Sequence, residues 1–178
     1  MSGQEHPWDN EPEFGEWTHA GLQCFVKRTK HGGHLCGYVG VPREHPWWGR
    51  SEDYRVHVTN LADRILDVDK VGVITAFCAP VHVDLEQEMA ALCLLLEAHG
   101  GITFTGEWPH RPGTWWFGFD CAHDGDAQPQ RPECGGQYRN WAFVAGETNR
   151  LAEQIAAWTE RIKADGVVTA ASSVTPGV

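Results

Sequence analysis

Residues 114–120, TWWFGFD, combine the alternation of a β-strand with bulky aromatic side chains, and this run restricts the possible folds more than any other. A second strand-like run, GITFTGE at 101–107, precedes it across WPHRPG, a connection rich in proline and glycine. Because short connections of this kind join antiparallel neighbours, the two runs predict a hairpin. The chain is therefore expected to build a sheet around an aromatic strand.

The register of this hairpin can be predicted from its side chains. Since side chains alternate between the two faces of a strand, pairing Thr105 with Trp116 separates apolar from polar residues. One face then gathers the core residues Ile102, Phe104, Trp115, Phe117 and Phe119. The other gathers Thr103, Thr105, Glu107, Trp116, Gly118 and Asp120. In this register Asp120 lies opposite Gly101, so residues 99–101 should meet the loop that follows Asp120.

Further segments predict an α+β domain. Residues 22–28 and 34–41 are β-rich runs on either side of a Gly-Gly turn and predict another hairpin. Apolar residues at helical intervals follow a capping-box pattern that begins at Asp84, which predicts a helix over 85–98. Residues 140–164 carry a second helical stripe. We expect an antiparallel or mixed sheet with these two main helices packed on one face.

The acidic N-terminal segment, residues 1–20, has no periodicity and is interpreted as an arm whose aromatic residues favour docking onto the fold. Residues 21–171 are then a single α+β domain, and residues 172–178 a flexible tail. The N-terminus has neither a basic leader nor an apolar run, and the longest apolar run elsewhere is too short to span a bilayer. These features predict a soluble cytoplasmic protein without a membrane partner.

Charge limits the partners further. The chain has 24 acidic and 14 basic side chains, a formal charge of −10, which repels polyphosphates over most of the surface. Broad nucleic-acid binding is therefore not expected, whereas a small-molecule ligand and a homo-oligomer both stay open. The six cysteines of a chain without a secretory signal are predicted to be free thiols.

The polar loop after residue 120 is the candidate site, because loops on rigid strands tend to carry functional groups. Imidazole and carboxylate groups suit zinc, manganese or iron, and such a metal could activate water. The candidate ligands are His99, Asp120, His123 and Asp126. Their spacing matches no standard metal motif. The structural alternative is that Asp124 and Asp126 form Asx turns and His99 caps a helix carbonyl.

Cys121 offers two other chemistries. With Cys36, His123 and Cys134 it could close a zinc site, although the usual Cys-x-x-Cys element is missing. It could also be a nucleophile activated by His123 or His99. A cysteine at the end of an aromatic strand is more often a core residue, and this is the interpretation we favour.

The polar face of the predicted hairpin suggests a binding site for a small polar, nucleotide-like ligand, which is the expected function. In this hypothesis an indole stacks on the ligand, hydroxyls and glycine amides contact it, and a guanidinium from Arg111 or Arg131 grips a phosphate. The residues assigned to it are Trp116, Thr103, Thr105, Gly100, Gly101 and Arg111. The alternatives are a metal-dependent phosphoester hydrolase and a protein–protein inhibitor that uses the acidic, Trp-rich arm.

The runs GYVGVP (37–42), HGGIT (99–103) and WWFGFDCAH (115–123) resemble motifs of an uncharacterised family from bacteriophages and actinobacteria. The segment from Tyr54 to Leu96 is longer than the corresponding stretch of that family. The resemblance implies a phage or prophage setting. Small proteins in that setting often act on host defence, for example by sequestering or degrading a nucleotide signal, so this role is expected by analogy.

Overall fold

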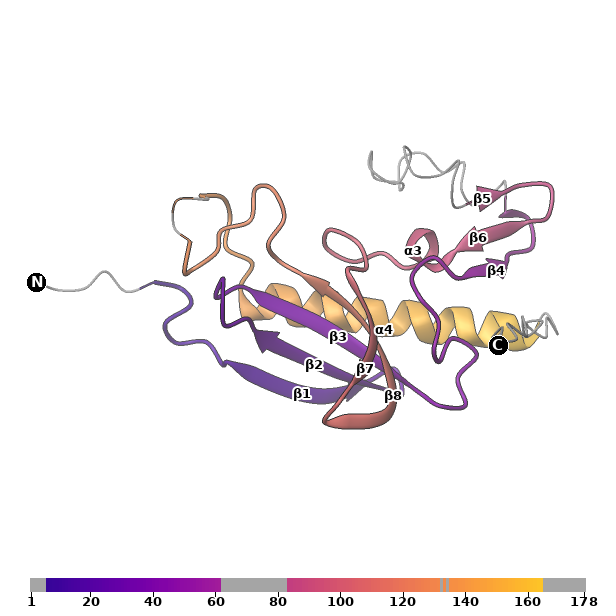
Figure 1. The fold of residues 1–178 in the computed structure, drawn as a ribbon, viewed down its shortest axis with the longest axis horizontal. Coiled ribbons are helices and arrows are strands. Elements are labelled where there is room, and N and C mark those ends of the chain that lie inside the picture. Colours follow the sequence, from indigo (N-terminus) through magenta and orange to yellow (C-terminus); the bar gives the residue numbers. More distant parts are fainter. Residues whose placement is uncertain (1–5, 62–82, 132, 134, 165–178) are drawn as a thin grey trace, which may run out of the picture.

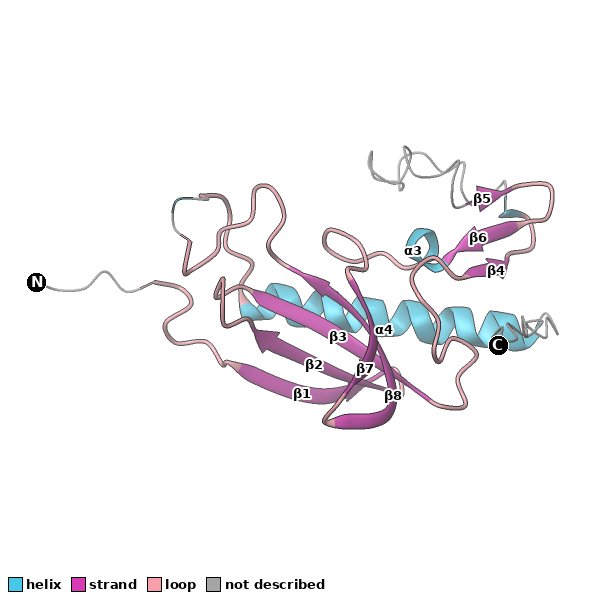
Figure 2. Cartoon of the chain, in the orientation of Figure 1, coloured by secondary structure: helices cyan, strands magenta, loops and turns pink. Residues whose placement is uncertain are grey.

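A five-stranded antiparallel sheet with one long helix on one of its faces dominates the structure (Figure 1, Figure 2). The structure is a computed structural model and describes residues 6–61, 83–131, 133 and 135–164. The strand order is β1-β2-β3-β8-β7, and every neighbouring pair is antiparallel. The bounds are β1 Phe14–His19, β2 Leu22–Arg28, β3 Leu35–Pro42, β7 Phe104–Trp108 and β8 Arg111–Asp120. The predicted α+β class and both predicted hairpins are confirmed.

A smaller, three-stranded sheet has the strand order β4-β6-β5. Its strands are β4 (Arg55–His57), β5 (Val83–Asp84) and β6 (Met89–Ala91), and the four-residue helix α3 (Leu92–Leu95) follows β6 directly. The side chains of Ala90, Ala91 and Leu92 are fully buried, so this sheet belongs to the same core as the main one.

Helix α4 (Trp141–Ala164) confirms the predicted helix at 140–164. Asn140 precedes it, and its side-chain oxygen accepts a hydrogen bond from the Phe143 amide at 2.9 Å, which caps the first turn. The helix buries Val144, Thr148, Leu151, Ala152, Ile155 and Thr159. It approaches β3 closely, because a Cβ built on Gly37 would lie only 2.2 Å from the Thr148 Oγ1 atom.

The helix predicted at 85–98 is wrong. Asp84 does accept hydrogen bonds from the Glu86 and Gln87 amides, at 3.1 and 3.0 Å, but these close a turn instead of starting a helix. Glu88 then has a φ of 51°, a left-handed conformation that stops helix propagation. Residues 89–91 form β6, and only 92–95 are helical. In the described chain α4 is therefore the single long helix.

The register of the β7–β8 hairpin differs from the prediction by one residue. Thr105 pairs with Phe117, and Gly106 pairs with Trp116. The strands continue to a tight turn between Trp108 and Arg111, with an irregularity after Glu107, so the connection is not the six-residue loop that the prediction assumed. Because one residue of slip exchanges the faces of a strand, β7 turns its other side to the core.

The main sheet consequently has two apolar faces. Phe117 and Phe119 lie in the core on the α4 side, as predicted. Phe104, however, lies on the opposite face, where its ring contacts Tyr38 and Trp108. That face also holds Phe25 and Trp116, whose ring centroids are 4.8 Å apart. The face predicted to be polar is thus an aromatic cluster, and we call Phe25, Tyr38, Phe104, Trp108 and Trp116 the open-face cluster.

The N-terminal segment contributes to the main sheet. Its residues 14–19 form the edge strand β1, and the β1–β2 turn lies at Ala20 and Gly21. The predicted tail at 172–178 lies outside the described residues. Within the part of the chain that is described, no helix is both long and apolar enough to cross a membrane.

Candidate metal centre

The loop that leaves β8 is a tightly hydrogen-bonded turn. The Ala122 amide donates to Asp120 Oδ1 at 3.0 Å, the His123 amide donates to Asp126 Oδ2 at 3.1 Å, and the Asp126 amide donates to the His123 carbonyl at 2.9 Å. Gly125 takes a φ of 85°, a conformation suited to glycine. These bonds fix the Asp126 side chain, which is 1% exposed.

His99 reaches this loop from the segment that follows α3. The Gly101 amide closes a turn on the Ala98 carbonyl at 2.9 Å, and Gly100 adopts a φ of 70°. A Cβ on Gly100 would lie 2.0 Å from the His123 ring, so only glycine lets this ring rest against the backbone. Residues 99–101 therefore contact the 121–126 loop, as predicted, although strands β7 and β8 pair in a different register from the predicted one.

Three side chains converge at this corner, and we call His99, His123 and Asp126 the triad. The distance from His99 Nε2 to Asp126 Oδ2 is 2.7 Å, and that from His123 Nδ1 to the same oxygen is 3.6 Å. One ligand atom from each residue lies within 4.8 Å of the others. Two imidazoles and one carboxylate in this arrangement could hold a metal ion while leaving coordination positions open.

The charge on Asp126 is stabilised by its neighbours. Burial alone would raise the pKa of Asp126, but hydrogen bonds from His99 and Arg139 outweigh it and hold the pKa below its ordinary value. The Arg139 Nε atom donates to Asp126 Oδ1 at 2.9 Å. This leaves Oδ2 facing the two imidazoles, so Arg139 orients the carboxylate toward them.

The two histidines are held differently. The His99 ring lies edge-on to Phe143, with ring centroids 5.4 Å apart, and it is 18% exposed. His123 is 31% exposed, yet its Nδ1 atom is buried and has no hydrogen-bond partner among the described residues. A buried ring nitrogen without a partner is costly, and a metal ligand bond would satisfy it.

Asp120 is the fourth metal ligand that the sequence predicted, and it lies next to the triad without joining it. Its Oδ1 atom is 3.9 Å from His123 Nδ1. Its Oδ2 atom accepts a hydrogen bond from the Thr103 hydroxyl at 2.8 Å, while Oδ1 accepts the Ala122 amide. The Thr103 hydroxyl and the Ala122 amide thus hold its carboxylate, and Asp120 is not among the three residues whose ligand atoms converge.

The residues assigned to a stacked ligand are separated by the fold. Trp116 is fully buried in the open-face cluster, where the Arg111 guanidinium already lies over its ring. Arg111 pairs with Glu16 far along β8, and the Thr105 hydroxyl donates to Glu52 Oε2 at 2.9 Å on the α4 side of the sheet. Only Gly100, Gly101 and Thr103 lie at the corner with the triad. The predicted stacking site is thus not formed.

The cysteine alternatives receive no support from the described residues. Cys36 and Cys121 are buried free thiols, and burial raises the pKa of both above the ordinary value of a thiol. A thiol held neutral in this way is a poor nucleophile and a poor metal ligand. Cys134, the other cysteine of the closed zinc hypothesis, lies outside the described residues.

Sequence reasoning missed three residues around the triad: Arg139, Phe143 and His34. The first two flank the start of α4, and the only signal for them was their place beside the N-cap Asn140. His34 immediately precedes β3, and the next residue, Leu35, accepts the Cys121 amide at 3.2 Å. Burial lowers the pKa of His34, and the charges of Asp120 and Asp126 oppose that effect.

Fold and site together define an α+β protein with a cluster of metal-ligand type, two histidines and one aspartate, at one end of its main sheet. No protein-family model, curated protein or solved structure matches the chain. The phage and actinobacterial resemblance therefore stays a prediction.

Proposed function

We propose that the chain is a metal-dependent hydrolase that holds one zinc or manganese ion at the triad and acts on a phosphoester. The observation that carries this proposal is that one ligand atom each of His99, His123 and Asp126 lies within 4.8 Å of the others. A metal held by three protein ligands can bind water, lower its pKa and polarise a phosphoryl oxygen.

The ligand atoms of the triad also indicate which class of metal ion would bind. Two imidazoles together with one carboxylate suit zinc, manganese or iron better than magnesium or calcium, which prefer a full set of oxygen ligands. Arg139 already neutralises one side of the single carboxylate, through the 2.9 Å contact with Asp126 Oδ1. Magnesium or calcium would therefore find little negative charge at this corner, whereas zinc or manganese could also bind the two rings.

Isothermal titration of the EDTA-treated protein with Zn²⁺ or Mn²⁺ tests the metal site. We expect one ion per chain, and Asp126→Asn should weaken binding by at least about 100-fold because it removes the shared oxygen ligand. Asp124→Asn is the matched control, since Asp124 is exposed on the same loop and lies outside the triad. Absence of binding, or equal binding by both variants, would contradict the proposal.

Hydrolysis is tested separately with a chromogenic phosphodiester. The metal-loaded wild type and Asp124→Asn should cleave it, and Asp126→Asn should not. Metal binding without cleavage would instead favour a second candidate, a phage accessory protein that binds a nucleotide-like ligand. Open space beside Gly101 and the exposed Thr103 hydroxyl next to the triad favour that candidate. A thermal-shift panel of nucleotides, read with Thr103→Val, distinguishes it.

A further inference from the structure

A second cluster lies at the far end of the sheet, on the face opposite α4. The Arg111 guanidinium lies over three aromatic rings, with its Cζ atom 5.1 Å from the Phe25 centroid, 5.6 Å from Trp116 and 5.7 Å from Phe14. Glu16 pairs with the same guanidinium. We call Phe14, Glu16, Phe25 and Trp116 the cage. Three rings and one carboxylate around a cation are the arrangement by which proteins recognise guanidinium and ammonium groups.

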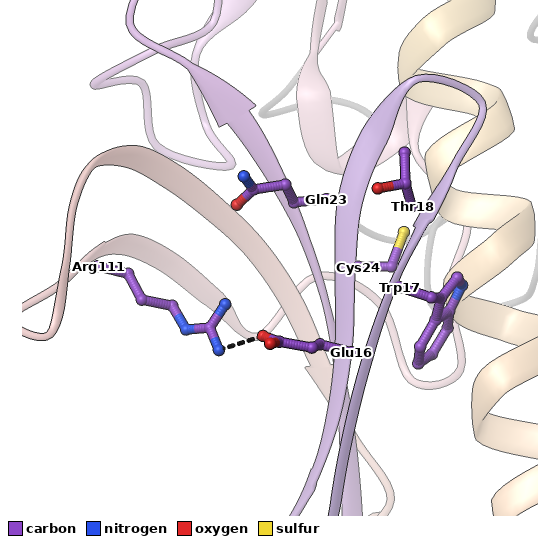
Figure 3. Close-up of a pocket in the computed structure, with 6 residues that line it drawn as sticks. All are labelled: Glu16, Trp17, Thr18, Gln23, Cys24 and Arg111. Carbon is purple, nitrogen blue, oxygen red and sulfur yellow. Dashed lines mark hydrogen bonds and ion pairs between the residues drawn. The ribbon is translucent and has the colours of Figure 1, made fainter.

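The cage borders an accessible hollow. Figure 3 shows Arg111 extending from the β7–β8 hairpin toward Glu16 on β1, with Gln23 of β2 beside them. The hollow has a volume of about 340 Å³ and is lined by Glu16, Trp17, Thr18, Gln23, Cys24 and Arg111. The Glu16 side chain is 56% exposed and Phe14 is 46% exposed, so solvent reaches the entrance. A side chain from another molecule could therefore approach the cage.

Two features of the chain indicate what such a molecule would be. Its charge of −10 attracts basic partners over acidic ones. Strand β1 is at the edge of the sheet, so its outer side is available to pair with an extended segment. The group that fills the cage now, a guanidinium, shows which chemical group fits.

We propose that the cage binds an arginine side chain of a basic, extended segment of a partner protein, and that Arg111 is the internal occupant which this arginine displaces. The proposal is independent of the triad, which lies at the other end of β8. It gives the acidic N-terminal segment a specific task through Phe14 and Glu16.

Removal of the internal occupant should expose the cage. Arg111→Met leaves a flexible, uncharged side chain that no longer pairs with Glu16, so it should bind N-acetyl-arginine amide at least about 10-fold more tightly than the wild type, because no charged competitor has to leave first. Binding is followed by tryptophan fluorescence in EDTA, which makes it independent of metal. Addition of Glu16→Gln should abolish the gain. Arg43→Met is the matched control, since Arg43 lies over Trp48, 4.8 Å away, outside the cage.

Equal affinity of Arg111→Met and the wild type would overturn the proposal, as would equal binding of the uncharged N-acetyl-norleucine amide. If circular dichroism shows that Arg111→Met does not fold, the proposal is tested on a protein that keeps Arg111. A tri-arginine peptide should then lose affinity by at least about 5-fold on Glu16→Gln, the change expected for loss of one charged hydrogen bond. Unchanged affinity of the peptide would overturn the proposal.

Discussion

His45 shows at the scale of one residue how burial fixes a protonation state. Its Nδ1 atom accepts a hydrogen bond from the Trp47 amide at 3.1 Å. The Thr159 hydroxyl donates to the Ile155 carbonyl, so His45 Nε2, 2.7 Å from that hydroxyl oxygen, must be the donor. Both ring nitrogens are thus used by the neutral form, and a second proton would meet the Trp47 N–H. Burial, assisted by the charge of Lys163, lowers the pKa of His45 to about 4.

This lowered pKa predicts acid sensitivity. The unfolded state, with an ordinary histidine pKa of about 6.5, binds more protons than the folded state between that pH and about 4. The contribution of His45 to stability is therefore full above pH 6.5 and is lost as the pH falls toward 4. Urea unfolding at pH 7 and pH 5 should show a loss about 1 kcal/mol larger in the wild type than in His45→Gln, after allowance for partial exposure. Identical losses in the two proteins would contradict the assignment.

At the scale of the element, the segment 85–98 shows why local patterns fail. Its apolar spacing and its Asp84 cap are those of a helix, and the cap bonds do form. Glu88 nevertheless receives the Asn60 amide on its side chain at 2.7 Å and the Val58 amide on its carbonyl at 2.7 Å. These contacts come from residues distant in sequence and favour strand pairing. Tertiary contacts therefore override local propensity here, and no single-segment pattern could reveal them.

The long helix α4 could be predicted because its apolar stripe extends over many helical turns. A pattern of that length outweighs individual contacts from other parts of the chain. What the sequence did not show is how closely it approaches β3. A Cβ at Gly37 would lie 2.2 Å from Thr148 Oγ1 and 2.6 Å from the Phe119 ring. Gly37→Ala should therefore lower the free energy of unfolding by about 2 to 3 kcal/mol, through overpacking of the helix against the sheet.

Gly146 is the control for this substitution, because it is exposed on α4 and has open space around its Cα atom. Gly146→Ala should raise the free energy of unfolding by up to about 1 kcal/mol, since alanine loses less backbone entropy in a helix. Both variants can be compared by urea denaturation. A neutral Gly37→Ala would show that α4 does not press on β3 at this point.

At the scale of the whole molecule, Glu11 joins the N-terminal segment to both layers of the fold. Its Oε1 atom accepts the Trp141 amide at the start of α4, at 2.9 Å. Its Oε2 atom accepts from Tyr138 and, at 3.3 Å, from Arg28 of β2. Arg28 is nearly buried and also donates to the Gly33 carbonyl at 2.7 Å. The carboxylate thus connects sheet, helix and N-terminal segment.

Glu11→Ala would remove the acceptor of the Trp141 amide and of the Tyr138 hydroxyl and one acceptor of Arg28, so it should lower the free energy of unfolding by about 2 kcal/mol. Glu13 also pairs with Arg28, at 2.9 Å, but its side chain is 77% exposed. Glu13→Ala should therefore cost under about 1 kcal/mol. The two variants can be compared by chemical denaturation at pH 7. Equal costs would show that Glu11 has no special role in joining the layers.

The site was predictable to the extent that it depends on chain connectivity. Pairing of the 101–120 hairpin brings His99 to the loop of His123 and Asp126 in either of the two registers. Which β7 side chains share the face of Trp116 depends on the register itself, and the observed register places Phe104 on that face in place of Thr105. The sequence could not show that Asp120 lies outside the triad, because the position of its carboxylate depends on hydrogen bonds from the Thr103 hydroxyl and the Ala122 amide.

The most direct test of the metal centre is anomalous diffraction from crystals grown with zinc or, in parallel, manganese. We expect one peak per chain at the corner, with bonds of about 2.0 to 2.2 Å from zinc to His99, His123 and Asp126. Crystals of Asp126→Asn should lack that peak. A wild-type crystal with no peak between these three side chains, or with its metal bound elsewhere on the chain, would contradict the account.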